Sequence, residues 1–252
     1  MTDSLQILYE DNHVLGVLKP AGMLSQGDST GDVTALDLAR RYIKEKHDKP
    51  GNVFLGLVQR LDRPVSGVMI IARTSKAASR LSTSFHDREA EKRYLCVVSG
   101  VVEGDSGELA GHIERAHHRS RLASTETERS RAAVLEYRVL GRFTPEEQAR
   151  AEHPRTRRDP ASMTLLEVHP RTGRHHQIRL QLSAAGYVIR GDIKYGARAP
   201  LPDKSIALHA WRLRVQHPVR DEIIDLFAPP PSHAPWSHFA AEIAALFPPP
   251  PA

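Results

Sequence analysis

The chain has a single cysteine, Cys96, among its 252 residues. One thiol excludes an intramolecular disulfide and any cysteine-rich zinc or iron–sulfur centre. No apolar run approaches the roughly 20 residues that a helix needs to cross a bilayer. Residues 1–4 also lack the basic and apolar regions of a secretion signal. We therefore expect a cytoplasmic protein that makes no contact with a membrane.

The sequence also lacks the motifs of several common site types. It contains no Walker-type phosphate loop and no G-x-G-x-x-G. The main sequence evidence for a nucleotide hydrolase or a dinucleotide-dependent enzyme is therefore missing. H-E-x-x-H is absent as well. The adjacent histidines His175 and His176 would point about 100° apart on a helix, where they could not chelate one ion together. We expect no metal and no cofactor.

The composition describes a soluble globular protein with a basic balance. Hydrophobic residues make up 40% and charged residues 26% of the chain. The formal net charge is +5 before any of the 14 histidines is protonated. Such a balance favours an anionic partner, and nucleic acid is the first class to consider.

Apolar runs and helix-periodic segments follow one another without regular alternation. Strands outnumber helices, which favours an α+β fold with a mixed, largely antiparallel sheet core, flanking helices and a central basic cleft. No break in composition forces a division, so residues 1–252 are expected to form a single domain. The expected strands are residues 5–10, 14–18, 68–72, 94–98, 134–140, 163–168 and 206–215, and the expected helices are residues 33–46, 76–86, 174–185 and 242–247.

Turn residues and loops complete this outline. Ser75 is expected to cap the helix that follows it, and Gly186 to end the helix that precedes it. Residues 104–131 indicate hairpins or irregular surface loops. Residues 144–160 indicate a mobile loop whose arginines either contact phosphates or belong to a solvated face. These arginines are Arg155, Arg157 and Arg158.

The most informative segment is residues 59–67, which reads QRLDRPVSG and precedes an apolar run. Asp62 stands between Arg60 and Arg63, whose permanent charges favour its ionised form. Pro64 disfavours helical backbone before it, and Gly67 permits a tight entry into a strand. An anionic carboxylate on a stiff loop is a nucleophile, an electrostatic stabiliser or a salt-bridged loop residue.

A second dense cluster spans residues 171–180, RTGRHHQIRL. A small-residue turn opens a helix there, and helix-start N–H groups favour an anion. Arg174 and Arg179 add fixed charge that suits a phosphate or a carboxylate such as Asp62. An ordinary charged surface helix remains the alternative.

Tyr94 follows Lys92 and Arg93 at the start of an expected strand. An aromatic ring beside cations is the combination that stacks on an extruded base. A tyrosine in this place is equally an ordinary packing residue, so Tyr94 alone decides nothing.

In combination and in this order, these segments resemble the RluA-type pseudouridine synthases. The likeness spans residues 5–215 and includes the catalytic-aspartate motif around Asp62 and a third motif at residues 172–179. The matching residues are 18–22, 60–62 with Ser66 and Gly67, 92–95 with Gly100, 172–174 with 176–179, and 191–192 with 195–196.

The resemblance implies an isomerase that converts uridine to pseudouridine in ribosomal or transfer RNA. Asp62 would be the catalytic carboxylate, as nucleophile on the sugar or as base at C2′, with Arg179 as its partner. Tyr94 would stack on the flipped uracil. RNA would be bound by Arg60, Arg63, Arg174 and His176. Neither cofactor nor metal is implied, and the protein would act as a monomer.

The sequence departs from the family pattern in three ways. Gln59 stands where members usually have histidine, and Val65 where they often have threonine. We expect these changes to alter loop packing rather than activity. The separate N-terminal RNA-binding domain of some members is not expected here, so the catalytic domain itself would contact RNA.

Two other classes remain as alternatives. One is a non-catalytic RNA-binding protein on the same scaffold, which would have no need of a carboxylate facing RNA phosphates. The other is a carboxylate-dependent hydrolase of nucleosides or glycosides. That chemistry usually needs two paired carboxylates, and no second acid lies in a comparable setting.

Overall fold

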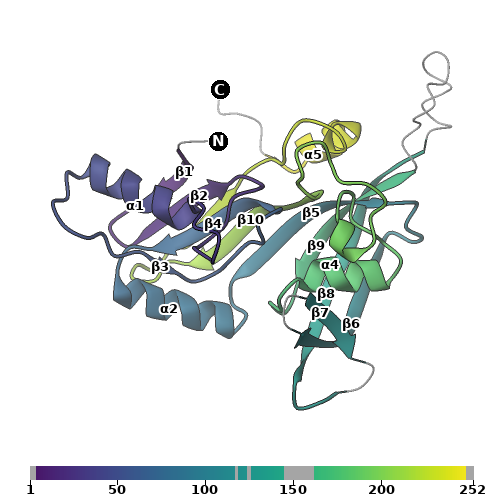
Figure 1. Cartoon of the computed structure of the whole chain (residues 1–252), viewed down its shortest axis with the longest axis horizontal. Coiled ribbons are helices and arrows are strands. Elements are labelled where there is room, and N and C mark those ends of the chain that lie inside the picture. The colour runs from purple at the N-terminus through teal and green to yellow at the C-terminus, as the bar shows by residue number, and fades with distance from the viewer. Residues whose placement is uncertain (1–3, 117–118, 124–125, 145–161, 248–252) are drawn as a thin grey trace. The chain divides into compact units, whose positions relative to one another are not determined.

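The computed structural model describes residues 4–116, 119–123, 126–144 and 162–247 (Figure 1). The chain divides into two compact units. Unit 1 contains residues 1–92 and 209–228, and unit 2 contains residues 93–208 and 229–252. Each unit combines strands with helices, and antiparallel pairing predominates, so the expected α+β class with a largely antiparallel sheet is confirmed.

Unit 1 is built on a sheet in which the strands lie in the order β1–β2–β4–β10–β11, with β3 beside β4. All pairs are antiparallel except β4 and β10, where Ser66 and His209 are parallel partners. The elements are β1 (Gln6–Glu10), β2 (Val14–Lys19), α1 (Ala35–Lys46), β3 (Gly56–Leu57), β4 (Ser66–Ala72), α2 (Ser75–His86), β10 (Leu208–Gln216) and β11 (Ile223–Phe227).

Strand β4 is the centre of unit 1, and all seven of its residues are buried. Its apolar side chains pack with those of β2, α2, β10 and β11 in one hydrophobic cluster that includes Val14, Ile70, Leu81, Leu213 and Leu226. Burial of side chains of this size stabilises a fold by about 1.5–3 kcal/mol each. The strand that follows the Asp62 loop is therefore a rigid support.

Both helices of unit 1 are capped at their N-termini by threonines. Thr34 and Asp37 form a reciprocal capping box at the start of α1. Thr74 caps α2 by accepting a hydrogen bond from the backbone N–H of Ala77. The expectation that Ser75 would be the cap is wrong by one residue, because Thr74 presents the same hydroxyl one position earlier and Ser75 becomes the first helical residue.

Unit 2 contains a fully antiparallel sheet in the order β5–β9–β8–β6–β7. Helix α4 packs on it through Gln181, whose side-chain amide donates to the carbonyls of Leu109 and Ala133. The elements are β5 (Glu91–Ser99), β6 (Ser106–Ala116), β7 (Arg119–Ala123), β8 (Ser130–Phe143), β9 (Met163–Pro170), α4 (Gln177–Ala184), η1 (Ile193–Tyr195), η2 (Trp236–Phe239) and α5 (Ala240–Ala244).

The expected elements of unit 2 are present with changed boundaries. The stretch read as hairpins or loops forms the β6–β7 hairpin, and β8 begins four residues earlier than expected, at Ser130. Helix α4 begins at Gln177 rather than Arg174, and α5 ends at Ala244. The arginines of the expected mobile loop lie within residues 145–161, outside the described part of the chain.

Two further properties concern chemistry. Cys96 is fully buried in β5, and burial raises the pKa of its thiol well above the usual value, as expected of an inert core cysteine. Within the described ranges, no helix is both long and apolar enough to cross a membrane.

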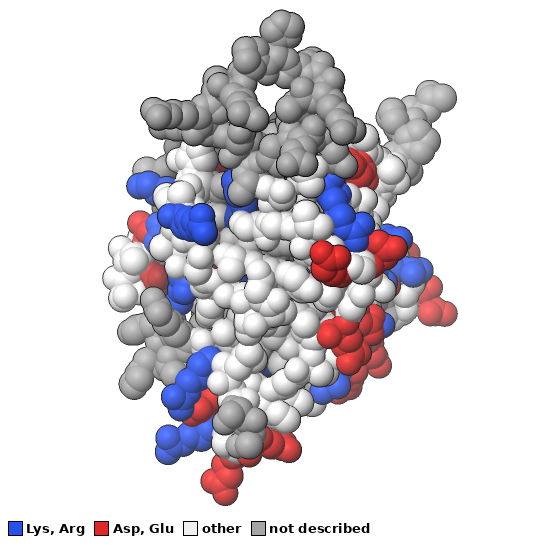
Figure 2. Space-filling model, turned by 90° about the vertical axis from the view of Figure 1, so that its right-hand side faces the viewer, with Lys and Arg blue, Asp and Glu red and all other residues white. Residues whose placement is uncertain are grey.

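Figure 2 shows one face of the protein, where charged side chains of both signs surround a wide uncharged area and do not gather into one basic patch.

Candidate functional site

The loop that carries Asp62 is attached by its main chain to the loop that follows β2. The backbone N–H of Gly22 donates to the carbonyl of Arg63 at 2.8 Å. The Ser25 hydroxyl donates to the carbonyl of Leu61 at 2.7 Å and accepts from the N–H of Leu61 at 3.1 Å. The residues on both sides of Asp62 are thus fixed by hydrogen bonds.

Lys19, the last residue of β2, is a second attachment of this loop. It is fully buried, and its ammonium donates to the carbonyls of Pro20 at 2.9 Å, Met23 at 2.7 Å and Arg63 at 3.4 Å. Burial lowers the pKa of Lys19 to about 7, while the negative charge of Asp62 raises it and the charge of Arg63 lowers it. Lys19 is thus a buried amine that holds the main chain of the Asp62 loop through its bond to the carbonyl of Arg63.

Gly67 fixes the point where the loop enters β4. Its φ is +135°, a conformation that side chains with a Cβ rarely adopt. A Cβ at this position would lie 2.4 Å from the carbonyl oxygen and 2.5 Å from the nitrogen of Ala210 in β10. The expectation of a tight glycine entry is confirmed, and the cause is the close approach of the β10 backbone.

A buried histidine supports the same entry. The Nε2 of His209 lies 3.0 Å from the carbonyl of Ala228, so it carries the proton, and Nδ1 accepts from the Ser66 hydroxyl at 2.8 Å. Burial lowers the pKa of His209 to about 4, against the raising effect of its bond to Ala228. This imidazole is neutral at ordinary pH and joins β4, β10 and the end of β11.

Arg63 does not pair with the aspartate beside it in the sequence. Its guanidinium makes an ion pair with Asp32 at 2.8 Å, and its Nε donates to the carbonyl of Gly22 at 3.0 Å. Arg60 is exposed. Arg63 therefore has its ion-pair partner in Asp32 on the adjacent loop.

In unit 2, Arg179 lies on α4 with only 5% of its surface exposed. Its Nε and Nη2 each donate to one carboxylate oxygen of Asp192 at 2.7 Å. The guanidinium carbon lies 5.0 Å from the ring centroid of Tyr195. The third-motif arginine is thus held in a fixed, buried orientation.

The turn before α4 is closed by its own side chains. Gln177 accepts a hydrogen bond from the backbone N–H of Arg174 at 3.0 Å and another from the Thr172 hydroxyl at 2.8 Å. The Nε of Arg174 donates to the carbonyl of Ala132 at 2.9 Å. One N–H expected to attract an anion is therefore already satisfied by Gln177.

The two histidines of this turn precede the helix. His176 has a φ of 55°, and its ring stacks on that of His175 with centroids 3.8 Å apart. The premise that they would point 100° apart on a helix is wrong, because the left-handed backbone at His176 delays the helix start. His176 Nδ1 shares a 2.8 Å hydrogen bond with the Tyr195 hydroxyl.

The expected site residues divide between the two units. Asp62, Arg60 and Arg63 belong to unit 1. Tyr94, in β5 opposite Val168 and half-buried, belongs to unit 2 with the third-motif residues. The third-motif residues are Arg174, His176 and Arg179.

Sequence reasoning missed the supporting roles of Lys19, His209, Asp192 and Tyr195. Lys19 looked like a turn residue because it stands before Pro20. Asp192 and Tyr195 belong to the last segment of the resemblance, which implied no role for them. Asp192 and Tyr195 lie at η1, the next helical segment after the one that carries Arg179, and this closeness in sequence was the only available indication of their role. Nothing in the sequence pattern distinguished His209 from other strand residues.

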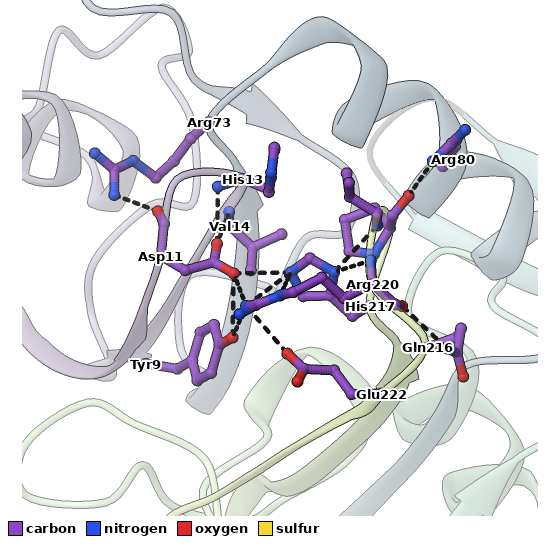
Figure 3. Close-up of polar contacts among 12 residues, drawn as sticks. Tyr9, Asp11, His13, Val14, Arg73, Arg80, Gln216, His217, Arg220 and Glu222 are labelled. Atoms are coloured by element: carbon purple, nitrogen blue, oxygen red, sulfur yellow. Dashed lines mark hydrogen bonds and ion pairs between the residues drawn. The ribbon is translucent and has the colours of Figure 1, made fainter.

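Unit 1 also contains a polar cluster at the other end of β4, which we call the Asp11 cluster: Tyr9, Asp11, His217 and Arg220 (Figure 3). Asp11 accepts from His217 Nε2 at 2.7 Å and forms an ion pair with Arg220. Two backbone N–H groups donate to His217 Nδ1, which fixes its tautomer. The cluster joins the β1–β2 turn to the β10–β11 turn.

Comparison with known proteins gives a consistent result. The family model described as RNA pseudouridylate synthase matches residues 13–184, which include the Asp62 loop, β5 and α4. The match covers more than half of the chain. The chain therefore belongs to the RNA pseudouridylate synthase family.

Curated relatives identify the branch as RluA-type. The dual-specificity RNA pseudouridine synthase RluA of Pasteurella multocida is 30% identical over 227 residues, covering 90% of this chain and 93% of that protein. The ribosomal large subunit pseudouridine synthase D of Nitrosomonas europaea is 31% identical over 229 residues, covering 87% of this chain and 60% of that protein. The chain thus spans about 60% of the length of this second relative.

A solved structure has a similar fold. The human RNA pseudouridylate synthase domain containing 4 matches with a TM-score of 0.71 at 23% identity, covering 94% of this chain and 92% of that one. At this identity the likeness supports the fold and not the activity.

Proposed function

We propose that the chain is an RNA pseudouridine synthase that isomerises uridine in ribosomal or transfer RNA. The observation that carries the proposal is Asp62 on its fixed loop, in the segment that the family model matches. Lys19 and Ser25 hold this loop through bonds to its main chain, and the close approach of β10 at Gly67 fixes its entry into β4. A carboxylate that must meet one atom of a sugar needs this kind of preorganisation.

The proposed reaction is balanced without any co-reactant. The bond between uracil N1 and C1′ breaks, the base turns, and C5 bonds to C1′. The hydrogen on C5 leaves as a proton, and N1 gains one. Asp62 would assist as nucleophile at C1′ or as base at C2′. Electron pairs stay within the nucleoside, so neither a cofactor nor a metal is required by this route.

A uridine within a stack is out of reach of any side chain, so the target nucleotide is proposed to flip out of the RNA. Tyr94, half-buried at the start of β5, would stack on the extruded uracil. A flat aromatic ring suits this role because it contacts the base face at any stage of the turn.

Arg179 is proposed as the partner of Asp62. Its bidentate bond with Asp192 uses Nε and Nη2, which fixes the plane of the guanidinium. Arg60 and Arg63, both exposed, and Arg174 and His176 would contact RNA. Contacts of these cations with RNA phosphates would release counterions from the RNA, so binding should weaken as salt is added.

The class of RNA is proposed from the relatives. One carries the name of a large ribosomal subunit enzyme and another that of a dual-specificity enzyme. Ribosomal RNA is therefore the first substrate to test, and transfer RNA, which the sequence motifs leave equally open, is the second. Ribosomal and transfer RNA act in the cytoplasm, and we propose the same location for this protein. We also propose that it acts as a monomer.

The test is a product analysis with three distinct outcomes. Purified protein would be incubated with ribosomal and transfer RNA transcripts. One part of each RNA would be digested to nucleosides, which reversed-phase chromatography resolves although uridine and pseudouridine have the same mass, and pseudouridine positions would be mapped on the other part by carbodiimide labelling and primer extension. The proposal predicts pseudouridine at one or a few positions and no free uracil. Unchanged RNA that is nonetheless bound would support a binding protein. Released uracil would support a hydrolase, and either outcome would overturn the proposal.

A further inference from the structure

The buried pair of Arg179 and Asp192 joins two separate elements of unit 2. Arg179 lies on α4, and Asp192 precedes η1. Their side chains are 6% and 1% exposed, and both bonds are 2.7 Å long. A bidentate pair of this geometry stops rotation of the guanidinium about its own axis.

Asp192 is itself fixed by a tight turn. Its N–H donates to the carbonyl of Ile189, and its carbonyl accepts from the N–H groups of Tyr195 and Ala197, at 3.0–3.1 Å. Gly191 before it has a φ of +83°, and a Cβ there would lie 2.7 Å from Leu201. The carboxylate therefore has a backbone that leaves it little freedom to move.

A second contact limits Arg179 from the face of its guanidinium. The ring of Tyr195 lies 5.0 Å from the guanidinium carbon, a cation–π distance. The Tyr195 hydroxyl shares a hydrogen bond with His176, and the backbone carbonyl of Tyr195 accepts from the Ser183 hydroxyl at 2.6 Å. Arg179 is thus held at its edge by Asp192 and at its face by Tyr195.

Stability does not account for this arrangement. Removing two opposite charges from water costs free energy that their attraction only partly returns, and well-packed apolar residues are often as stabilising. A matched pair in unit 1 shows the ordinary case: Arg212 and Asp225 are also bidentate, at 2.8 and 2.6 Å, but 37% and 33% exposed. The burial of the Arg179 pair requires another reason.

We propose that Asp192 is a positioning residue that fixes the orientation of Arg179 for the reaction, with Tyr195 as its second support. This inference rests on the proposed synthase function and assigns a role to the loop after α4. Neither residue needs to touch RNA, because both act through the guanidinium.

The main test is Asp192→Asn, which keeps the shape but removes the charge and one acceptor. We expect kcat to fall about 100-fold, the loss typical of a small misplacement, with KM for RNA unchanged within about twofold. The control is Asp225→Asn in the exposed pair, which should leave kcat unchanged. A folded Asp192→Asn protein with the wild-type kcat would overturn the proposal.

A double-mutant cycle separates positioning from a general structural role. If Asp192 acts through Arg179, then Asp192→Asn should add less than about threefold to the loss already caused by Arg179→Lys. Full multiplication of the two losses would contradict the proposal.

If Asp192→Asn does not fold, variants of Tyr195 test whether the contacts that orient Arg179 determine the rate. Tyr195→Phe keeps the ring over Arg179 and should retain kcat within about twofold, whereas Tyr195→Leu should lower it about tenfold. Equal rates in these two variants would overturn the proposal. Inactive wild-type protein would instead reject the synthase function itself, so the two failures are distinguishable.

Discussion

The two units hold their candidate catalytic groups by different chemistry. In unit 1, the Asp62 loop is fixed through its main chain, by Lys19, Ser25 and the glycine entry to β4. In unit 2, Arg179 is fixed through its side chain, by the carboxylate of Asp192 and the ring of Tyr195.

The difference follows from what each group has to do. A short carboxylate follows its backbone, so rigid main chain is enough to aim it. A long arginine side chain has several rotatable bonds and carries about 2 kcal/mol of rotamer entropy, so it needs partners at its tip. Substitutions that loosen the Asp62 loop should therefore act on its stability and, through it, on the rate, whereas those beside Arg179 should act mainly on the rate.

The largest expected effect in unit 1 is that of Gly67→Ala. The added Cβ would meet the Ala210 backbone at 2.4 Å in a conformation unfavourable to alanine. We expect a loss of about 4 kcal/mol in the free energy of unfolding. Gly22→Ala is the matched control: Gly22 has a φ of +83° but no atom within 4 Å of the added Cβ, so it should lose only about 1–2 kcal/mol. Equal losses, measured by chemical denaturation, would contradict the steric account.

Lys19→Met tests the carbonyl attachment of the loop. It removes the donor to Pro20, Met23 and Arg63, and we expect a loss of about 2 kcal/mol in stability together with a lower kcat. The exposed Lys76→Met should change stability by less than about 0.5 kcal/mol. A Lys19→Met protein with unchanged stability and rate would show that the loop is held without the ammonium.

His209 makes the stability of unit 1 sensitive to acid. Its pKa is about 4 in the folded state, against an ordinary value of 6.5, so the unfolded chain binds more protons between these values. Stability should therefore be intact above pH 6.5 and fall by up to about 3 kcal/mol as pH drops to 4. Denaturation curves across this range should show the slope in the wild type and lose it in His209→Asn; the same slope in both would assign it to other groups.

Arg220→Ala in the Asp11 cluster should have the smallest effect. Arg220 is 48% exposed, and Asp11 keeps its bond from His217 Nε2 at 2.7 Å (Figure 3). Exposed ion pairs contribute about 0–1 kcal/mol, so stability should change by less than about 1 kcal/mol and activity not at all. A loss of activity would show that this end of unit 1 takes part in function.

Much of the fold follows from local signals. The apolar run at residues 68–72 predicts β4, because a strand that is buried on both faces is apolar throughout and does not alternate with polar residues. Residues 33–46 predict α1 with only its start displaced, because Thr34 caps it. The start of α4 was missed because the left-handed backbone at His176, with a φ of 55°, delays the helix to Gln177.

The candidate site was less accessible to sequence reasoning, because its partners are distant along the chain. Arg63 pairs with Asp32 from another loop, and Lys19 reaches Arg63 over 44 residues. His209 meets Ser66 over 143 residues. Residue types at a motif can suggest which groups react, but which side chains support them depends on strand pairing that local patterns do not contain.

The most direct test of Asp62 as the essential carboxylate compares the wild-type protein with Asp62→Asn on RNA tritiated at uracil C5. Formation of the C5–C1′ bond releases that tritium to water, and RNA binding can be measured on the same samples. We expect Asp62→Asn to bind RNA within about twofold of the wild type and to release no tritium above background. Tritium release by Asp62→Asn at the wild-type rate would contradict this assignment.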